Sequence, residues 1–250
     1  ENGGEDLGAR PKKLMLAAGA INTTKIVLES YKDYSTKLRL LDNPGIQIPF
    51  VIPRFIGKHL EKESFGLGQL NFIYTTKYTN KRLQGSILEI TSPSRTEFFA
   101  NLPFAAKDNI LMLKFLVPAI FVCYIFYPCD EKNSAQISLQ QNGIVQIKGN
   151  PVIFPKQDKI DIVKIFRKLG AYSHTRLAVE VENGLGIHYA GTLPMRKTPT
   201  MKYETNEYGE LSNCKNVYIV DGASFPELPA KNYSFTLMAN AMRIAEHIFN

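Results

Sequence analysis

Two stretches near the carboxyl end contain the residues whose types and order could do chemistry. The first, HYAGTLPM at 188–195, places His188 directly before a run of small residues. The second, NVYIVDGASFPELPAKNYSFTLMANAMRIAEHI at 216–248, has the pattern of a strand, a turn-rich loop and a helix. A histidine with a pKa of about 6.5 can accept a proton at neutral pH, so His188 is a candidate general base.

The loop in the second stretch is typical of a ligand site in α/β proteins. The chain leaves the strand through Asp221 and Gly222, passes Asn232 and enters the helix near Ser234. Ligands of such proteins bind where strands end at their carboxyl side. A helix N-terminus carries about half a positive charge, which favours an anionic group. If this loop and His188 meet in space, they form a site.

Both ends of the sequence predict a strand, a turn and a helix. Residues 12–20 are predicted to form a buried strand that ends in small residues, and 22–32 a helix capped by Asn22 or Thr23. The 216–248 stretch repeats this order. We therefore predict an α/β class, with residues 1–42 and 186–250 packed together as one α/β body.

The middle of the sequence, residues 43–185, predicts an inserted domain with an antiparallel sheet. Strand patterns dominate from 68 to 150, and Asn142-Gly143 between two alternating runs predicts a hairpin with a type I′ turn. Residues 155–172 have the apolar spacing of a helix. Gly170 is expected to close that helix.

Composition excludes some classes of function. The net charge is +7, but no stretch concentrates the basic residues among aromatic ones, so we expect no nucleic-acid partner. The three cysteines lack metal-ligand spacing, so we expect no metal site. Lys114 and Pro118 interrupt the apolar run at 109–128, which favours a buried strand over a membrane span. The compartment stays open, with the cytoplasm slightly favoured.

Three segments, in this order, resemble the carboxyl-terminal part of glucose–methanol–choline (GMC) oxidoreductases. They are LAAGAINTTKIVLES at 16–30, GIHYAGTLPM at 186–195 and the 216–248 stretch. The resemblance implies an FAD-dependent enzyme that oxidises a CH–OH group of a small alcohol or sugar by hydride transfer to the flavin. It also implies that 43–185 is the substrate domain and that the flanking segments belong to the FAD-binding domain.

The resemblance assigns a role to each matching residue. His188 matches the catalytic histidine of the family, and Asn232 matches its partner position. Asp221 and Gly222 match positions near the ribityl and pyrophosphate side of the flavin, and Ser234 lies where the chain passes its pyrimidine edge. The residues implied to contact the cofactor are Ala17, Ala18, Gly19, Asp221, Gly222, Asn232 and Ser234.

The sequence also departs from the family pattern. The family binds FAD through a G-x-G-x-x-G motif in a βαβ unit, and no such motif occurs here. We therefore expect activity to need a nucleotide-binding part outside this sequence. Tyr233 replaces a proline of the family after Asn232, which is expected to loosen the loop. Two alternatives remain: a flavin-containing lyase without net redox chemistry, and a truncated product that binds or assembles without catalysis.

Overall fold

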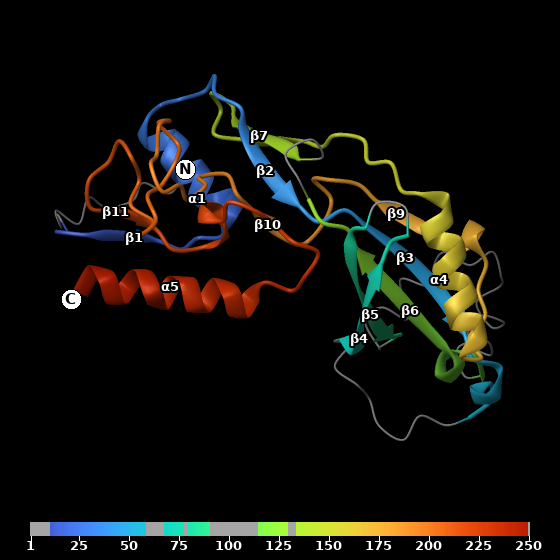
Figure 1. The fold of residues 1–250 in the computed structure, drawn as a ribbon. Coiled ribbons are helices and arrows are strands. Elements are labelled where there is room, and N and C mark those ends of the chain that lie inside the picture. Colours follow the sequence, from blue (N-terminus) through green and yellow to red (C-terminus); the bar gives the residue numbers. More distant parts are fainter. Residues whose placement is uncertain (1–10, 59–67, 78–79, 91–114, 130–133, 250) are drawn as a thin grey trace.

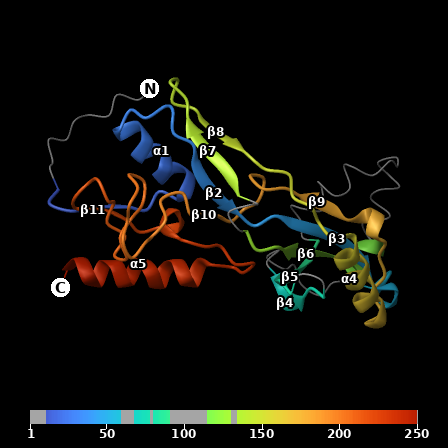
Figure 2. The ribbon, with the colours of Figure 1, turned by 45° about the horizontal axis from the view of Figure 1, so that its top comes forward.

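The chain folds into two lobes, which β2 (Leu38–Asp42) and β3 (Gly45–Val51) connect in one continuous path (Figures 1 and 2). The structure is a computed structural model that describes residues 11–58, 68–77, 80–90, 115–129 and 134–249. The start of the first predicted domain, residues 1–10, and the start of the apolar run, residues 109–114, lie outside these ranges.

The first lobe is built on two short parallel strands from opposite ends of the chain. β1 (Leu14–Leu16) pairs with β11 (Val217–Ile219). Successive side chains of a strand point to opposite faces. Accordingly, Ile219 joins the apolar cluster beneath α1 (Ala20–Ser30), whereas Tyr218 packs against α5 (Ser234–Phe249). The two helices therefore cover opposite faces of the strand pair (Figure 1).

A four-stranded antiparallel sheet lies beside this strand pair. Its order is β10-β2-β7-β8, where β7 is Ala135–Leu139, β8 is Val145–Lys148 and β10 is Tyr189–Ala190. Leu40, Ala135 and Ile137 form its buried centre. The short strand β10 directly follows His188, so the register of Tyr189 opposite Asp42 fixes where the histidine enters the fold.

The second lobe is a five-stranded antiparallel sheet covered by one helix. Its order is β4-β5-β6-β3-β9. The remaining bounds are β4 Gly68–Thr75, β5 Arg82–Glu89, β6 Ile120–Phe126, β9 Val179–Val181 and α4 Lys156–Lys168. Four short 3₁₀ turns complete the described elements, at Pro53–Phe55, Val117–Ala119, Thr175–Leu177 and Gly222–Ser224. Alternate residues of β3 are buried, and Phe50 stacks on Phe121 and contacts the tilted ring of Phe166 on α4.

The predicted mixed α/β class is confirmed, as is the helix that Gly170 closes with a φ of 82°. The predicted cap of the first helix is wrong. α1 begins at Ala20, directly after Gly19, whose φ of 84° suits glycine. Because the chain turns sharply at Gly19, the helix begins before the predicted cap residues Asn22 and Thr23. Thr23 consequently lies inside the helix, where its hydroxyl donates to the carboxylate of Asp221.

The hairpin between β7 and β8 is confirmed, but its predicted type I′ turn is wrong. A type I′ turn needs positive φ at both central residues, and only Gly143 has it, at 76°. The N–H of Gly143 donates to the carbonyl of Gln140, and the N–H of Gln140 donates to the carbonyl of Ile144. This pattern is a three-residue loop that ends on a left-handed glycine.

The predicted domain limits at 42 and 186 stay a prediction. β1, α1, β11 and α5 share the first lobe, as expected of 1–42 and 186–250. The hairpin at 135–148, however, pairs with β2 in the sheet that also holds β10. This hairpin therefore contacts the first lobe, although it was predicted within the inserted range 43–185.

We predict that Thr23→Val lowers the free energy of unfolding by about 1.5–3 kcal/mol, the usual contribution of a hydrogen bond to a charged group. Thr23 is fully buried and donates to Asp221, and valine keeps its shape without the hydroxyl. Denaturant unfolding measures the change. Thr198→Val is the matched control, because Thr198 is exposed. Equal stability of the two variants would contradict this role of Thr23.

Candidate active site

His188 lies at the meeting point of three parts of the fold. Its ring contacts Phe126 at the end of β6, with ring centroids 4.9 Å apart, and Tyr233 just before α5, at 5.2 Å and nearly perpendicular. Its backbone leads into β10. The two aromatic rings leave the imidazole half-buried.

A hydrogen bond and burial set the chemistry of His188. Its Nδ1 lies 3.3 Å from Oδ1 of Asn43, at the junction between β2 and β3. Burial lowers the pKa of the ring, because the low-dielectric surroundings disfavour the charged form. The imidazole is therefore neutral at neutral pH, as a group that accepts a proton must be.

Asp42 holds the loop that leads to His188. Its Oδ2 accepts hydrogen bonds from the backbone N–H of Gly184 at 2.9 Å and of Gly186 at 2.7 Å. A Cβ on Gly186 would lie 2.1 Å from this carboxylate, so the close approach requires glycine. Burial raises the pKa of Asp42 to about 6, and the two amides act against the rise.

Asp221 joins the two ends of the chain. One oxygen accepts from the N–H of Gly19 at 2.9 Å and from the hydroxyl of Thr23, and the other accepts from the N–H of Ala223 at 2.9 Å. The residue is 4% exposed. Its carboxylate therefore fixes the turn at 17–19 and the start of the 221–233 loop against each other.

The 221–233 loop contacts the backbone that carries His188. The N–H of Gly191 donates to the carbonyl of Gly222 at 2.9 Å, and the hydroxyl of Tyr233 donates to the carbonyl of Tyr189 at 3.2 Å. Tyr233 also packs on Phe225. The expectation that Tyr233 loosens this loop is wrong, because its ring and hydroxyl fasten the loop to β10.

Five of the other predicted residues are exposed. Asn232 and Ser234 are exposed at the beginning of α5, on either side of Tyr233. Ala17, Ala18 and Gly19 form an exposed turn after β1. Nothing lies within 4 Å of the place where a Cβ on Gly19 would be, so the backbone there is open to a ligand.

Sequence reasoning missed Asp42, Asn43 and the contacts of Tyr233. The two polar residues occur in LDNPGIQIP, at the limit between the first predicted domain and the inserted domain. The available signal was that two polar residues directly follow the apolar strand LRLL. In the structure both are buried, with Asp42 at 0% and Asn43 at 1% exposed.

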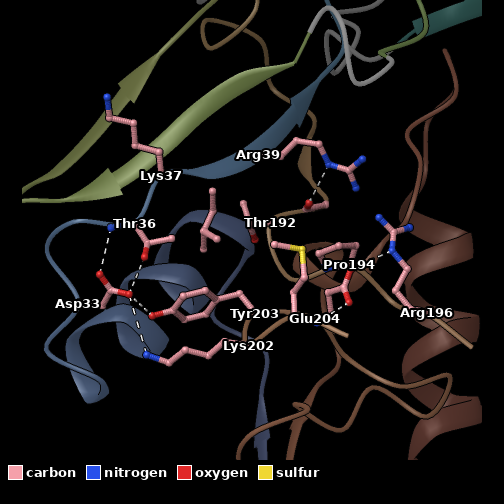
Figure 3. A pocket seen from close by; sticks show the side chains of 13 residues that line it. Asp33, Thr36, Lys37, Arg39, Thr192, Pro194, Arg196, Lys202, Tyr203 and Glu204 are labelled. Atoms are coloured by element: carbon pink, nitrogen blue, oxygen red, sulfur yellow. Dashed lines mark hydrogen bonds and ion pairs between the residues drawn. The ribbon is translucent and has the colours of Figure 1, made fainter. Parts of the chain in front are cut away.

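A separate cavity of about 480 Å³ lies between the α1–β2 connection and residues 191–204 (Figure 3). None of the predicted site residues lines it. Its charged side chains interact with each other. The hydroxyl of Tyr203 donates to Asp33, which lowers the pKa of that carboxyl, and Arg196 bonds Glu204 at 3.2 Å.

The described residues contain neither a candidate metal site nor a candidate membrane-spanning helix. There, no group of three or more His, Cys, Asp or Glu side chains is placed to hold a metal ion. None of the helices in the same ranges combines the length and apolar character needed to cross a bilayer.

Part of the carboxyl-terminal region matches a known protein family. Residues 167–241 match the family model described as GMC oxidoreductase. No curated protein matches the chain in sequence. The fold is similar to that of pyridoxine 4-oxidase from Mesorbium loti, with a TM-score of 0.57 at 11% identity. Two variants of formate oxidase from Aspergillus oryzae, from work on FAD modification, give TM-scores of 0.56 and 0.60 at 10% and 11% identity.

The chain spans about half the length of these solved structures. In each comparison 94% of this chain is matched, but only 51% of the pyridoxine 4-oxidase chain and 53% of each formate oxidase chain. At such low identities the similarity shows the fold.

We predict that the ring of His188 titrates below the ordinary histidine pKa of about 6.5, because burial disfavours its charged form. Protonation then favours the unfolded chain, so the contribution of His188 to stability is complete above that value and is lost as the pH falls below it. NMR titration of the ring measures the midpoint.

Unfolding of the protein and of His188→Gln, from about pH 7 to about pH 5, checks the linked stability. The variant should lose less stability on acidification. Asp42 acts with the opposite sign, since its pKa is raised to about 6, so the difference between the two proteins reports His188. A ring midpoint at or above the ordinary value would contradict the prediction.

Proposed function

We propose that the chain is part of an FAD-dependent enzyme that oxidises a CH–OH group of an alcohol or sugar, on the premise that the match of residues 167–241 to the GMC oxidoreductase model reflects membership of that family. One observation carries the proposal. The segment 184–191, called here the His188 loop, contacts the 221–233 loop through hydrogen bonds to Gly222 and from Tyr233. A neutral imidazole therefore lies beside the loop that enters α5.

The proposed chemistry divides between the cofactor and this chain. FAD, when bound, accepts the hydride from the carbon of the alcohol. His188 accepts the hydroxyl proton, because its lowered pKa keeps the imidazole neutral at neutral pH. Asn232 is exposed one residue before Tyr233, and its amide holds the alcohol oxygen without competing for the proton.

The residues on the cofactor side fit such a group in part. The turn at 17–19 is exposed, and the open space at Gly19 lets a ligand approach the backbone closely. The N-terminus of α5, at Ser234, favours the negative charge that a reduced flavin carries. Asp221 acts indirectly in this scheme, because its carboxylate already accepts three hydrogen bonds from the protein.

Exposed apolar side chains on the first lobe support the proposal that another part of the enzyme completes the cofactor site. Leu14 and Met15 on β1 are each 42% exposed. One side of α5 also presents large apolar side chains, namely Phe235, Met238, Met242 and Phe249. In the proposal, a nucleotide-binding part of the same enzyme covers this surface and contributes the phosphate-binding turn that is absent from this sequence.

We predict that the isolated chain binds FAD more weakly than about 1 μM, or not at all. The described residues offer one open turn and one helix N-terminus, whereas tight dinucleotide binding uses a glycine-rich βαβ unit. Titration of FAD into the purified chain, followed by flavin fluorescence, measures the affinity. Sub-micromolar binding with quenching would show that the chain holds the cofactor by itself.

We predict that His188→Ala, in the enzyme with its nucleotide-binding part, slows flavin reduction by about 100- to 10,000-fold while the flavin stays bound. The base is lost, but Gly19 and the start of α5 are unchanged. Asn232→Ala should slow reduction less, because it orients the substrate and accepts no proton. Anaerobic stopped-flow reduction by a panel of alcohols and sugars, with the visible flavin spectrum, measures both effects.

Two outcomes would overturn parts of this proposal. Reduction of His188→Ala at the parental rate would exclude histidine as the base. A colourless His188→Ala variant would show that His188 supports cofactor binding. His174→Ala is the matched control, because the ring of His174 is exposed and, among the described residues, its one hydrogen bond is from the backbone N–H of Arg176.

A further inference from the structure

We propose that Asn43 is a positioning residue that fixes the tautomer of His188, with the proton on Nδ1 and the lone pair of Nε2 turned to the substrate. The geometry concerns the histidine alone. Its catalytic consequence rests on the proposed function, in which His188 is the base.

The orientation of the Asn43 amide follows from its partners. Its Nδ2 lies 2.9 Å from the carbonyl oxygen of Tyr127 and 3.3 Å from that of Pro229. Carbonyl oxygens only accept hydrogen bonds, so the NH₂ group has to face them. The amide oxygen is then turned to Nδ1 of His188, 3.3 Å away. Rotating the amide by half a turn would set oxygen against two carbonyls.

The tautomer of His188 follows from that orientation. An amide oxygen only accepts, so the Nδ1 of a neutral imidazole has to carry the proton in this hydrogen bond. Nε2 is left with the lone pair, and it has no hydrogen-bond partner among the described residues. This nitrogen is the one available to take a proton from a substrate.

The fold makes this contact difficult to move. Asn43 is 1% exposed, and its three partners come from the end of β6, the 221–233 loop and the His188 loop. The preceding residue, Asp42, holds the backbone of the same His188 loop through Gly184 and Gly186. Asp42 thus fixes the backbone of the loop, and Asn43 fixes the ring of His188.

The first test reads the tautomer directly. In the ¹⁵N-labelled chain at a pH above about 6.5, the Nδ1 of His188 should give the signal of a protonated imidazole nitrogen and Nε2 that of an unprotonated one. His188→Gln assigns the signals. The opposite pattern in the unmodified chain would overturn the proposal without the need for any variant of Asn43.

The second test removes and restores the acceptor. Asn43→Ala should give a mixture of both tautomers. Asn43→Asp keeps an oxygen near Nδ1 and should restore the Nδ1–H form, read at a pH high enough that the ring is neutral, because the added carboxylate raises the pKa of the imidazole. Asn213→Ala, on an exposed turn, is the control and should leave the signals unchanged. Retention of a pure Nδ1–H form in a folded Asn43→Ala variant would show that another group sets the tautomer.

The rate of flavin reduction separates this proposal from the proposed function. In the enzyme with its nucleotide-binding part, Asn43→Ala should lower kcat by about three- to tenfold with KM little changed, which corresponds to the loss of about one hydrogen bond. If the tautomer shifts as expected but His188→Ala reduces its flavin normally, the proposed role of His188 as the base fails and the positioning by Asn43 stands. If the tautomer does not shift, the positioning fails alone.

Discussion

The buried carboxylate of Asp221 is the group on which both the first lobe and the candidate site depend. Burying a carboxylate is costly unless hydrogen bonds replace its hydration. Here three donors do so: two from the segment around α1 and one from the loop after β11. Because Gly19 and Asp221 are 202 positions apart in the chain, this single group joins two halves of a lobe that no local interaction could hold together.

The position of the histidine follows from this anchor in short steps. Asp221 fixes Gly222, whose carbonyl accepts the N–H of Gly191, and β10 is therefore held beside the loop. Tyr233 completes the contact from the other end of the same loop, with its hydroxyl on Tyr189 and its ring against His188. The imidazole is thus oriented by backbone contacts on one side and by aromatic rings on the other.

Local patterns predicted much of the fold, because local forces determine it. The helix α4 and the hairpin of β7 and β8 follow from local patterns alone, and the order of strand, turn and helix around Gly19 was correct. The turn type at Asn142 and the start of α1 were not, because each depends on the backbone angles of a single residue. The separate histidine and Asp221 loops were identified from residue type and resemblance, and only the structure brings them into contact.

The role of Asn43 could not be predicted from the sequence for a different physical reason. Its partners His188, Tyr127 and Pro229 lie 145, 84 and 186 positions away. A hydrogen bond over such a separation produces no periodic pattern in the sequence. Asn43 lies at the predicted limit between two domains, and nothing in the local pattern indicates that polar residues there are buried. Burial is what lets Asp42 and Asn43 support the site.

The order of the two residues at this junction has a physical reason. The backbone N–H groups of Gly184 and Gly186 point into the protein and need a strong acceptor, which the carboxylate of Asp42 provides although burial raises its pKa to about 6. Its second oxygen has no hydrogen-bond partner among the described residues, so the arrangement costs stability. The ring of His188, in contrast, needs an uncharged acceptor if it is to stay neutral. A carboxylate at position 43 would favour the imidazolium form, whereas the amide of Asn43 orients the ring and leaves it neutral. The charge is therefore placed against the backbone, and the uncharged group is placed against the imidazole.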